Sequence, residues 1–263
     1  MIMNIIVCIK QVVAGDQVKI HPQTHGLVRT AEYSSLNPFD LFALEMAVQL
    51  KKDHSGSITV LTMGPKISEE VLREALAFGA DRAILLSDPR FAASDTLATS
   101  YVLGMGIRKI GPFDLILCGM RTTDSDTAQV GPQLAEELDL PHVTGVENLQ
   151  RITNLFRVER ISDGFREILE VSAPALFSIS PRGIVHLPSL VEIQEAFIKY
   201  PVESWNLEDI KADPTKVGMA GSGTWVETLI PITPQKSCTF IEGDIRQQAK
   251  LLLSKLVEKN LLS

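Results

Sequence analysis

The stretch Asn4-Ile5-Ile6-Val7-Cys8-Ile9, close to the start of the chain, is almost entirely apolar and rich in β-branched side chains. A continuous apolar run of this length is typical of a parallel strand that is buried on both faces. Similar runs recur along the chain, and segments with the 3.6-residue period of amphipathic helices separate them. The further apolar runs are residues 58–63, 83–86 and 114–118, and the helical segments are 39–50, 71–78, 97–105 and 134–138. This alternation predicts right-handed βαβ units, and therefore a Rossmann-like, doubly wound parallel sheet with helices on both faces.

The chain has 263 residues, of which 45% are hydrophobic and 22% are charged, so it can bury a sizeable core. Its formal net charge of −7 argues against duplex nucleic acid or an anionic membrane surface as the main partner, because both require a basic face. A nucleotide is not excluded, since a few backbone N–H groups can hold one. No apolar run reaches the roughly 18–20 residues that a membrane span requires.

The three cysteines, Cys8, Cys118 and Cys238, form no Cys-x-x-Cys pattern, so they predict neither a disulfide framework nor a metal site. Cys8 and Cys118 lie on predicted strands, where cysteine is most often a small core residue. The N-terminal stretch begins with a strand-like run rather than a cleavable signal peptide. A reducing cytoplasm is therefore the simplest compartment.

After about residue 150 the pattern changes. Residues 155–160 and 166–171 flank Ser162-Asp163-Gly164, which predicts a β-hairpin over about 154–172 with a short Asp-Gly turn. Residues 175–179 are predicted as the last strand.

The rest of the chain is predicted as an extended arm that runs from Pro181 to about residue 237, followed by an amphipathic helix over about 244–259. We therefore expect an α/β domain over residues 1–182, and an arm with a terminal helix over residues 183–263. The arm and helix need a surface to pack against, and the sequence leaves open whether a partner subunit or the same domain provides it.

Ligands of an open parallel sheet bind beyond the carboxyl ends of its strands, and the loop from Gly119 to Pro132 follows one such end. Pro132 must lie in the first turn of the next helix, so the N-cap of this helix can hardly precede Gln129. Four small or polar residues then lie at or just before the helix N-terminus, where free N–H groups favour a phosphate: Thr127, Ala128, Gln129 and Val130. Asp126 would accept a ribose hydroxyl or an N–H of the turn. An ordinary capped loop explains the same pattern.

A second polar helix start lies at Ser94-Asp95-Thr96-Leu97-Ala98-Thr99-Ser100. Thr96 and Thr99 are one turn apart and would both face one diphosphate, although plain capping by Ser94 or Asp95 explains part of the segment equally well. The Asn37-Pro38 pair is a natural turn and cap, and a contact to adenine or ribose is the less common alternative. Residues 218–223 are predicted as a flexible loop rather than a phosphate cradle.

The chain contains no Ser/His/Asp set, no Walker lysine motif and no metal-binding quartet. No residue is therefore predicted to be catalytic, and any redox chemistry has to come from a bound cofactor.

These residues resemble the β subunit of electron transfer flavoproteins, over nearly the whole chain. The segments that carry the resemblance are Val7-Cys8-Ile9-Lys10-Gln11-Val12, Leu36-Asn37-Pro38-Phe39-Asp40, Met63-Gly64-Pro65, Arg73-Glu74-Ala75-Leu76-Ala77, Gly79-Ala80-Asp81, Asp95-Thr96-Leu97-Ala98-Thr99-Ser100 and the loop from Asp124 to Pro132. One branch of this family holds AMP as a structural ligand on an Asn-Gln-Thr-Gly loop. The loop here, Asp-x-Asp-Thr-Ala-Gln-Val-Gly-Pro, instead resembles the electron-bifurcating branch, in which the β subunit holds FAD and meets NAD(H).

The resemblance implies a role for each segment of the site. Thr127, Ala128, Gln129 and Val130 would hold phosphate through their N–H groups, with Lys10, Asp126 and Gly131 beside them. Asp95, Thr96 and Thr99 would serve the diphosphate and ribityl end, and Cys8, Asn37 and Met63 would line the adenosine pocket. Arg121, Thr122, Thr123 and Asp124 would face the isoalloxazine and nicotinamide rings.

Two positions depart from the family pattern. Ser125 replaces the glycine that usually separates the two aspartates, and serine suits a positive φ less well than glycine. Leu187-Pro188-Ser189-Leu190 resembles the family's recognition loop, in which Leu190 matches the leucine that docks in a partner dehydrogenase. The lysine-rich run that commonly follows is replaced by Val191-Glu192-Ile193-Gln194-Glu195, which points to a different docking partner.

The resemblance therefore implies an electron-transfer subunit that acts within a flavoenzyme complex and is not a stand-alone catalyst. The complex would contain an α subunit with its own FAD, and would bifurcate or confurcate electrons between NADH, ferredoxin and an acyl-CoA or hydroxy-acid dehydrogenase. One alternative within the family is a one-flavin carrier with AMP in the same pocket. An alternative of another class is a nucleotide-binding regulatory module without a redox role.

Overall fold

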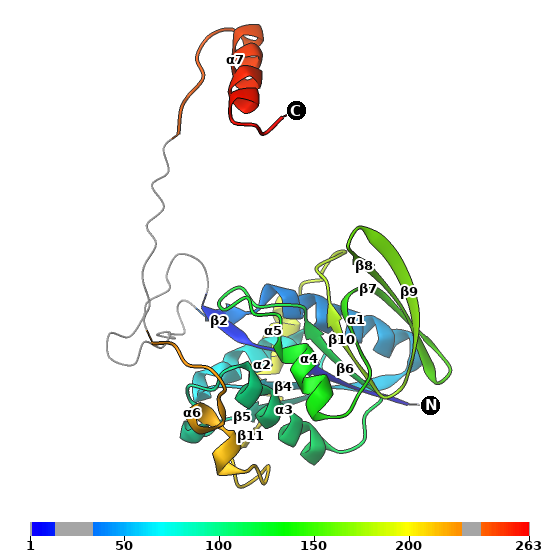
Figure 1. The fold of residues 1–263 in the computed structure, drawn as a ribbon. Coiled ribbons are helices and arrows are strands. Elements are labelled where there is room, and N and C mark those ends of the chain that lie inside the picture. Colours follow the sequence, from blue (N-terminus) through cyan, green and yellow to red (C-terminus); the bar gives the residue numbers. More distant parts are fainter. Residues whose placement is uncertain (1, 14–33, 228–237, 263) are drawn as a thin grey trace. The chain divides into compact units, whose positions relative to one another are not determined.

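The computed structural model describes residues 2–13, 34–227 and 238–262 (Figure 1). The chain divides into two compact units, Met1–Glu227 and Thr228–Ser263. The second unit contains helix α7 (Ile245–Glu258), which begins with a capping box: the Asp244 carboxylate accepts the N–H groups of Arg246 at 2.8 Å and Gln247 at 2.9 Å. The predicted terminal helix is therefore confirmed.

The first unit is built on a nine-stranded sheet. Its strands are β1 (Met3–Cys8), β4 (Gly56–Met63), β5 (Arg82–Leu86), β6 (Leu115–Gly119), β7 (His142–Ile152), β8 (Leu155–Ser162), β9 (Phe165–Ser172), β10 (Ala175–Ile179) and β11 (Val202–Trp205). They are ordered β11-β5-β4-β1-β6-β10-β7-β8-β9. Pairing is parallel from β11 to β7 and antiparallel from β7 to β9. A separate antiparallel pair joins β2 (Gln11–Val13) to β3 (Ser34–Leu36).

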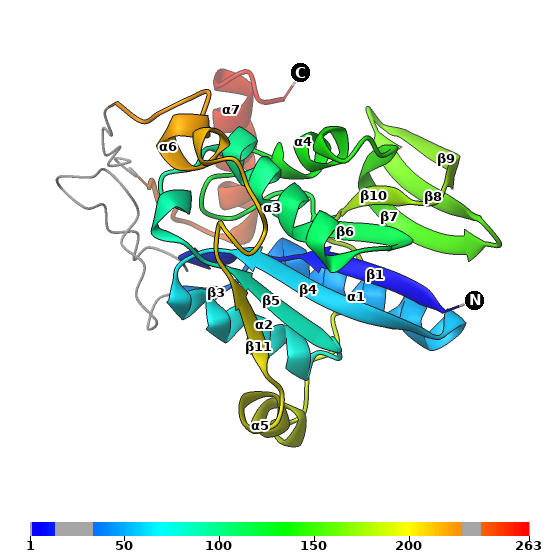
Figure 2. The same ribbon diagram turned by 90° about the horizontal axis from the view of Figure 1, so that it is seen from below.

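Helices cover both faces of the sheet, as predicted for a doubly wound fold (Figure 2). Side chains alternate along β1, so Ile5 and Val7 pack with α1 (Pro38–His54) and α2 (Glu69–Ala77) on one face. Ile6 and Cys8 pack with α3 (Thr96–Ile110) and α4 (Val130–Glu137) on the other face. Each large side chain buried in this way contributes roughly 1.5–3 kcal/mol.

The predicted helix over 97–105 is confirmed as part of α3. Val102 and Ile107 are fully buried, whereas Leu97 is 52% exposed in the first turn.

The predicted hairpin is confirmed as β8 and β9. The backbone conformation of its turn explains why Asp and Gly occupy the tip. Asp163 and Gly164 both adopt positive φ, at 50° and 80°, between the paired residues Ser162 and Phe165. Two central residues with positive φ form the turn whose twist matches that of the flanking strands, and Asp-Gly is a favoured sequence for it.

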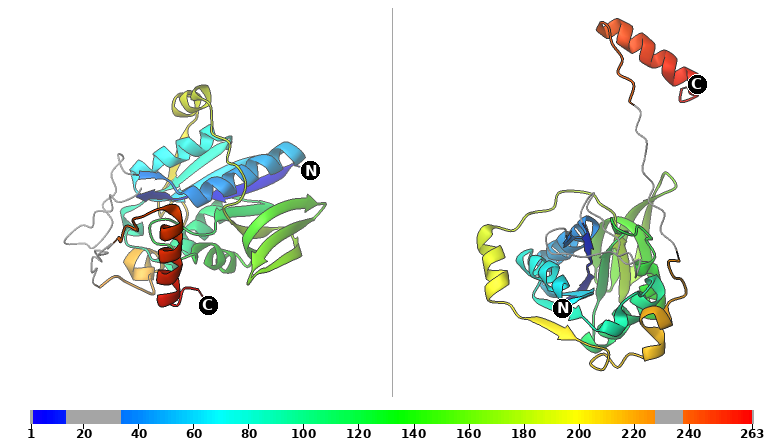
Figure 3. Two further views of the ribbon diagram at one scale, coloured as in Figure 1. Left: turned by 90° about the horizontal axis from the view of Figure 1, so that it is seen from above. Right: turned by 90° about the vertical axis from the view of Figure 1, so that its left-hand side faces the viewer.

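Regular structure continues in the segment that was predicted as an arm. Helix α5 (Leu190–Ile198) packs on α2 through buried Ala196, and β11 pairs in parallel with β5 at the edge of the sheet (Figure 3). The prediction that residues 175–179 form the last strand is therefore wrong. A strand as short as β11 leaves little periodicity, and its place is fixed by distant contacts: Arg82 Nε lies 2.6 Å from Glu203 Oε1, and Lys109 Nζ lies 4.1 Å from the centre of the Trp205 ring.

No helix in the described parts of the chain combines the length and apolar character needed to cross a bilayer. Those parts also hold no group of three or more histidine, cysteine, aspartate or glutamate residues arranged to bind a metal ion.

Candidate nucleotide site

The carboxyl ends of β1 and β6 meet at the point where the strand order reverses. From β1 the chain continues to β4 and β5 on one side, and it then returns to β6 on the other side. Open α/β sheets bind ligands in the crevice at such a switch point. The predicted cofactor residues in the loops after β1 and β6 are brought together here.

An ion pair joins these two loops. Lys10 Nζ lies 2.7 Å from Asp124 Oδ1 and donates a second hydrogen bond of 3.3 Å to Ser125 Oγ. The Asp124 side chain is only 1% exposed. Burial alone would raise its pKa, but the Lys10 ammonium and the hydrogen bonds around the carboxylate hold the pKa of Asp124 below its usual value. Asp124 is therefore an ionised, buried anchor for the loop.

The strained residues of this loop are Asp126 and Ala128, with φ of 49° and 55°. Ser125 is not among the residues with positive φ, and its hydroxyl lies 3.1 Å from Thr122 Oγ1. The replacement of glycine by Ser125 therefore costs no backbone strain here. Non-glycine residues in the left-handed region persist only where their surroundings hold them, and such residues cluster at functional sites.

Helix α4 begins as Pro132 predicts, with Gln129 as its N-cap and Pro132 in its first turn. Thr127, Ala128 and Gln129 are exposed ahead of this turn, at the positive end of the helix. Gly131 differs, because it is buried. A Cβ at Gly131 would lie 2.5 Å from Ser178 Oγ, so its smallness serves the close packing of α4 on the sheet.

The N-terminus of α3 lies beside that of α4. Thr96 Oγ1 donates to Gln129 Oε1 at 3.2 Å, and Ser100 Oγ donates to the carbonyl of Val130 at 3.3 Å. Thr99 is half-buried on the same helix. Two helix N-termini are thus joined side by side, which widens the region that attracts anions.

Asp95 has a structural task that the sequence did not predict. One carboxylate oxygen accepts the N–H of Ala98 at 3.0 Å and so caps α3, while the other accepts the N–H of Thr224 at 2.9 Å and its hydroxyl at 3.0 Å. Residues 218–221, which were predicted to be loop, form the short helix α6 (Gly218–Gly221). Asp95 therefore fixes the chain that follows α6 to the start of α3.

Asn37 is the N-cap of α1 and is completely buried between the two strand ends. Its N–H donates to the carbonyl of Lys10 at 2.9 Å, and its Nδ2 donates to the carbonyl of Arg121 at 3.0 Å. Its Oδ1 is buried and has no hydrogen-bond donor among the described residues. A buried acceptor without a partner costs about 1–3 kcal/mol, so a hydroxyl or amino group of a bound nucleoside fits here.

Asp40 belongs to the same turn, and the sequence pattern predicted no role for it. Its Oδ2 accepts the N–H of Lys10 at 2.7 Å, and its Oδ1 accepts the N–H of Gly119 at 3.0 Å. Burial raises the pKa of Asp40 to about 7, although these hydrogen bonds and Asn37 oppose the shift. Its position one turn before Ala43 and Leu44 on the buried side of α1 is the signal that could have identified it.

Cys8 and Cys118 are neighbours in register at the ends of β1 and β6. Burial raises the pKa of the Cys8 thiol well above its ordinary value and that of Cys118 to about 12. Both are therefore neutral thiols, consistent with core packing, and Cys8 lies directly before the Lys10 loop. Met63 is partly buried at the end of β4.

The remaining predicted residues of the loop lie on its outer side. The Arg121 guanidinium lies 4.8 Å from the centre of the Phe39 ring, and its Nη1 lies 3.4 Å from Asp126 Oδ2. Thr123 is exposed. Arg121 is thus supported by α1 but is still about half exposed.

The predicted recognition segment forms the start of a helix. Ser189 caps α5 in a capping box with Glu192, while Leu187 and Leu190 are 82% and 84% exposed. Pro188 is partly buried between them. The segment thus displays two large apolar side chains.

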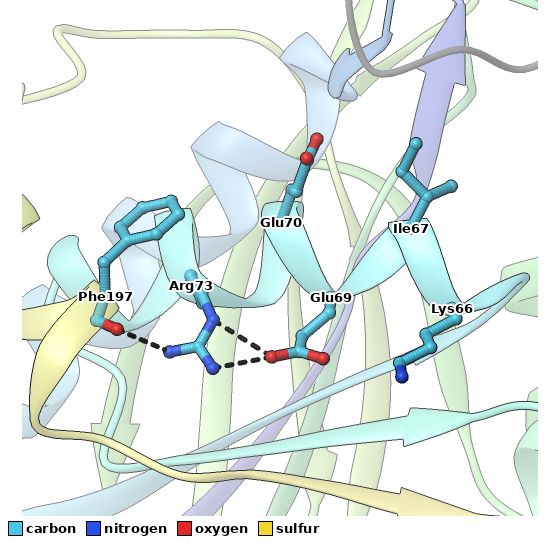
Figure 4. A pocket seen from close by; sticks show the side chains of 6 residues that line it. All are labelled: Lys66, Ile67, Glu69, Glu70, Arg73 and Phe197. Atoms are coloured by element: carbon cyan, nitrogen blue, oxygen red, sulfur yellow. Dashed lines mark hydrogen bonds and ion pairs between the residues drawn. The ribbon is translucent and has the colours of Figure 1, made fainter.

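Arg73 attaches α5 to α2. It pairs with Glu69 and donates from Nη1 to the carbonyl of Phe197 at 3.1 Å (Figure 4). A surface hollow lies beside these groups, and its lining residues are Lys66, Ile67, Glu69, Glu70, Arg73 and Phe197. The hollow contains none of the predicted cofactor residues.

Comparison with known proteins identifies the family. The model of the electron transfer flavoprotein domain matches residues 24–209. The chain belongs to the electron transfer flavoprotein family. It is 38% identical to the electron transfer flavoprotein subunit beta of Thermoanaerobacterium thermosaccharolyticum, over 99% of this chain and 100% of the relative. It is therefore a β subunit of this family, and its function is electron transfer.

Two further relatives carry more specific names. Protein FixA of Sinorhizobium fredii is 42% identical over 89% of this chain and 85% of the relative. The caffeyl-CoA reductase-Etf complex subunit CarD of Acetobacterium woodii is 39% identical over 99% of this chain and 100% of the relative.

Proposed function

We propose that this β subunit pairs with an α subunit that carries its own FAD, and that it binds a second FAD and NAD(H) for electron bifurcation or confurcation. In the forward direction NADH would transfer a hydride, and with it two electrons, to the FAD held by this subunit. One electron reduces ferredoxin, and the other passes through the α subunit to an acyl-CoA or hydroxy-acid dehydrogenase. The reverse direction is equally compatible with the site.

The observation that carries the proposal is the pair of joined helix N-termini at the switch point. The 3.2 Å bond from Thr96 to Gln129 sets the start of α3 beside the start of α4. Two adjacent N-termini favour a diphosphate over a single phosphate, because each adds N–H donors and a positive dipole end. A dinucleotide such as FAD therefore suits the site better than AMP, which would use one N-terminus.

The residues of this chain would hold the cofactor as follows. The N–H groups of Thr127, Ala128, Gln129 and Val130, together with Thr96 and Thr99, would bind the diphosphate. Asn37 Oδ1 would accept a hydrogen bond from the adenosine portion. FAD supplies the redox chemistry when bound, and the protein positions it and sets its electrostatic environment.

The name of the CarD relative, which refers to a caffeyl-CoA reductase-Etf complex, supports a lasting association with an acyl-CoA-type dehydrogenase. We propose that Leu187, Pro188, Ser189 and Leu190, at the start of α5, contact that partner.

The direct test is to extract and count cofactors from the purified complex of this chain with its co-expressed α subunit. Two FAD per heterodimer, bleached by NADH, are expected. One FAD and one AMP would instead identify the AMP-binding form of the family. No flavin and no co-purifying subunit would indicate a regulatory module and would contradict the proposal.

A matched variant tests the site itself. Asn37→Ala removes the buried acceptor and the bond to the Arg121 carbonyl, so we expect nucleotide affinity to fall about tenfold. Asn148→Ala, on β7, is the control and should bind nucleotide like the wild type.

A further inference from the structure

We propose that Asp40 is a positioning residue of the nucleotide site, whose carboxylate sets the spacing between the loops after β1 and β6. The inference rests on the proposed function in taking FAD as the ligand.

The contacts of Asp40 place it between the two loops. One of its oxygens accepts the main-chain N–H of Lys10, in the loop after β1, at 2.7 Å, and the other accepts that of Gly119, the last residue of β6, at 3.0 Å. The approach at Gly119 is so close that a Cβ there would lie 2.5 Å from Asp40 Oδ1. The two hydrogen bonds tie both backbone segments to one carboxylate, which fixes their separation.

Asn37 adds two further hydrogen bonds to the same two segments. Asp40 accepts the N–H groups of Lys10 and Gly119. Asn37, three residues earlier in the same turn, donates to the carbonyls of Lys10 and Arg121. Lys10 in turn holds Asp124. The position of the loop that leads to α4 therefore depends on Asp40, although Asp40 lies beneath the site and is 4% exposed.

The ionised carboxylate suits the two N–H groups best, because a protonated oxygen is a weaker acceptor and its own O–H needs a further partner. Burial raises the pKa of Asp40 to about 7. The charged and titratable groups that interact with it are Lys10, Cys8 and Cys118. The raised pKa of each thiol keeps it neutral near pH 7, so Asp40 is the group here whose ionisation changes between pH 6 and pH 8.

Asp114 provides a matched control. It joins the same two strands at their opposite ends, where its Oδ2 accepts the N–H of Asn4 at 2.8 Å. Asp40→Asn and Asp114→Asn each neutralise a carboxylate that accepts a main-chain N–H from β1 or from the residues after it, but only Asp40 touches the loops of the site.

The test measures FAD affinity from pH 6 to pH 8, using the complex of the full chain with its α subunit after bound nucleotide has been removed. FAD is the probe because its diphosphate does not titrate in this range. We expect wild-type affinity to fall about tenfold from pH 8 to pH 6. Asp40→Asn should bind about tenfold more weakly at pH 8 and show no such step, whereas Asp114→Asn should follow the wild type.

Two results would overturn the proposal: Asp40→Asn binding like the wild type, or Asp114→Asn showing the same loss as Asp40→Asn. If Asp40→Asn does not fold, the wild-type pH profile decides, and a flat profile contradicts the role. A wild-type complex that binds AMP but not FAD at this site overturns the proposed function alone, and the two variants are then compared with AMP at pH 8. A wild-type complex that binds neither overturns both.

Discussion

Lys10 Nζ lies 2.7 Å from Asp124 Oδ1, although 114 residues separate them in the sequence. Removing the ammonium leaves a carboxylate that is 1% exposed without its main counter-charge. Because Lys10 itself is partly exposed, we expect Lys10→Met to lower the free energy of unfolding by about 1–3 kcal/mol, which urea denaturation can measure. The double variant with Asp124→Asn should recover part of this loss, and strictly additive losses would show that the pair is not coupled.

The stability of the chain should depend on pH through Asp40. Its pKa is about 7 in the folded chain, against about 3.9 for a solvated aspartate. The folded state therefore binds a proton that the unfolded state has released, and this stabilisation is complete below about pH 4 and lost as the pH rises to about 7. The loss is at most about 4 kcal/mol.

Urea unfolding at several pH values checks this dependence, and Asp40→Asn should lack it. FAD affinity should change in the opposite direction, rising with pH, because the ligand needs the loops in the spacing that the ionised carboxylate sets. The idea fails if the wild type and the variant share one stability profile.

Arg73 should control how firmly α5 is held. Its Nη1 donates to the carbonyls of Ala196 at 3.2 Å, Phe197 at 3.1 Å and Tyr200 at 3.3 Å. Lysine keeps the charge but cannot reproduce the planar fork, so Arg73→Lys should cost about 1 kcal/mol and expose residues 183–201 to limited proteolysis. Arg108→Lys, which changes an arginine on α3, is the control. Equal cleavage of that variant within 183–201 would argue against an anchoring role of Arg73.

Leu190 should matter for partner binding but not for folding. Its side chain is 84% exposed, so Leu190→Ala should change the free energy of unfolding by no more than about 0.5 kcal/mol. Capture of the partner dehydrogenase in a pull-down should fall strongly. Ile198→Ala, at the other end of α5 and 73% exposed, is the matched control. Full retention of the dehydrogenase by Leu190→Ala would refute the proposed contact.

Local sequence patterns were sufficient to predict several elements. The apolar run at β1 indicated a strand buried on both faces, and Pro132 limited the start of α4 because proline cannot lie deeper in a helix. The Asp163-Gly164 pair predicted its turn because both positions need positive φ. In each case the deciding forces act within a few residues.

The candidate site was only partly predictable, because the contacts that form it join residues that are far apart in the sequence. The sequence indicated the polar loop at 119–132 but not that Asp40 lies under it, because the bond from Gly119 joins residues 79 positions apart. Asp95 was expected to face a diphosphate, and its carboxylate also holds Thr224, 129 positions away. Strand β11 was missed because four residues carry little periodicity and are placed by their pairing with β5.

The sequence by itself thus determined the alternation of strands and helices, the helix start at Pro132 and the hairpin turn, since backbone sterics and the burial of apolar stripes act locally. Only the tertiary structure decided which polar groups meet at the ends of β1 and β6. A carboxylate such as Asp40 is stable in the core only when N–H groups from two distant loops reach it, and no local pattern encodes that meeting.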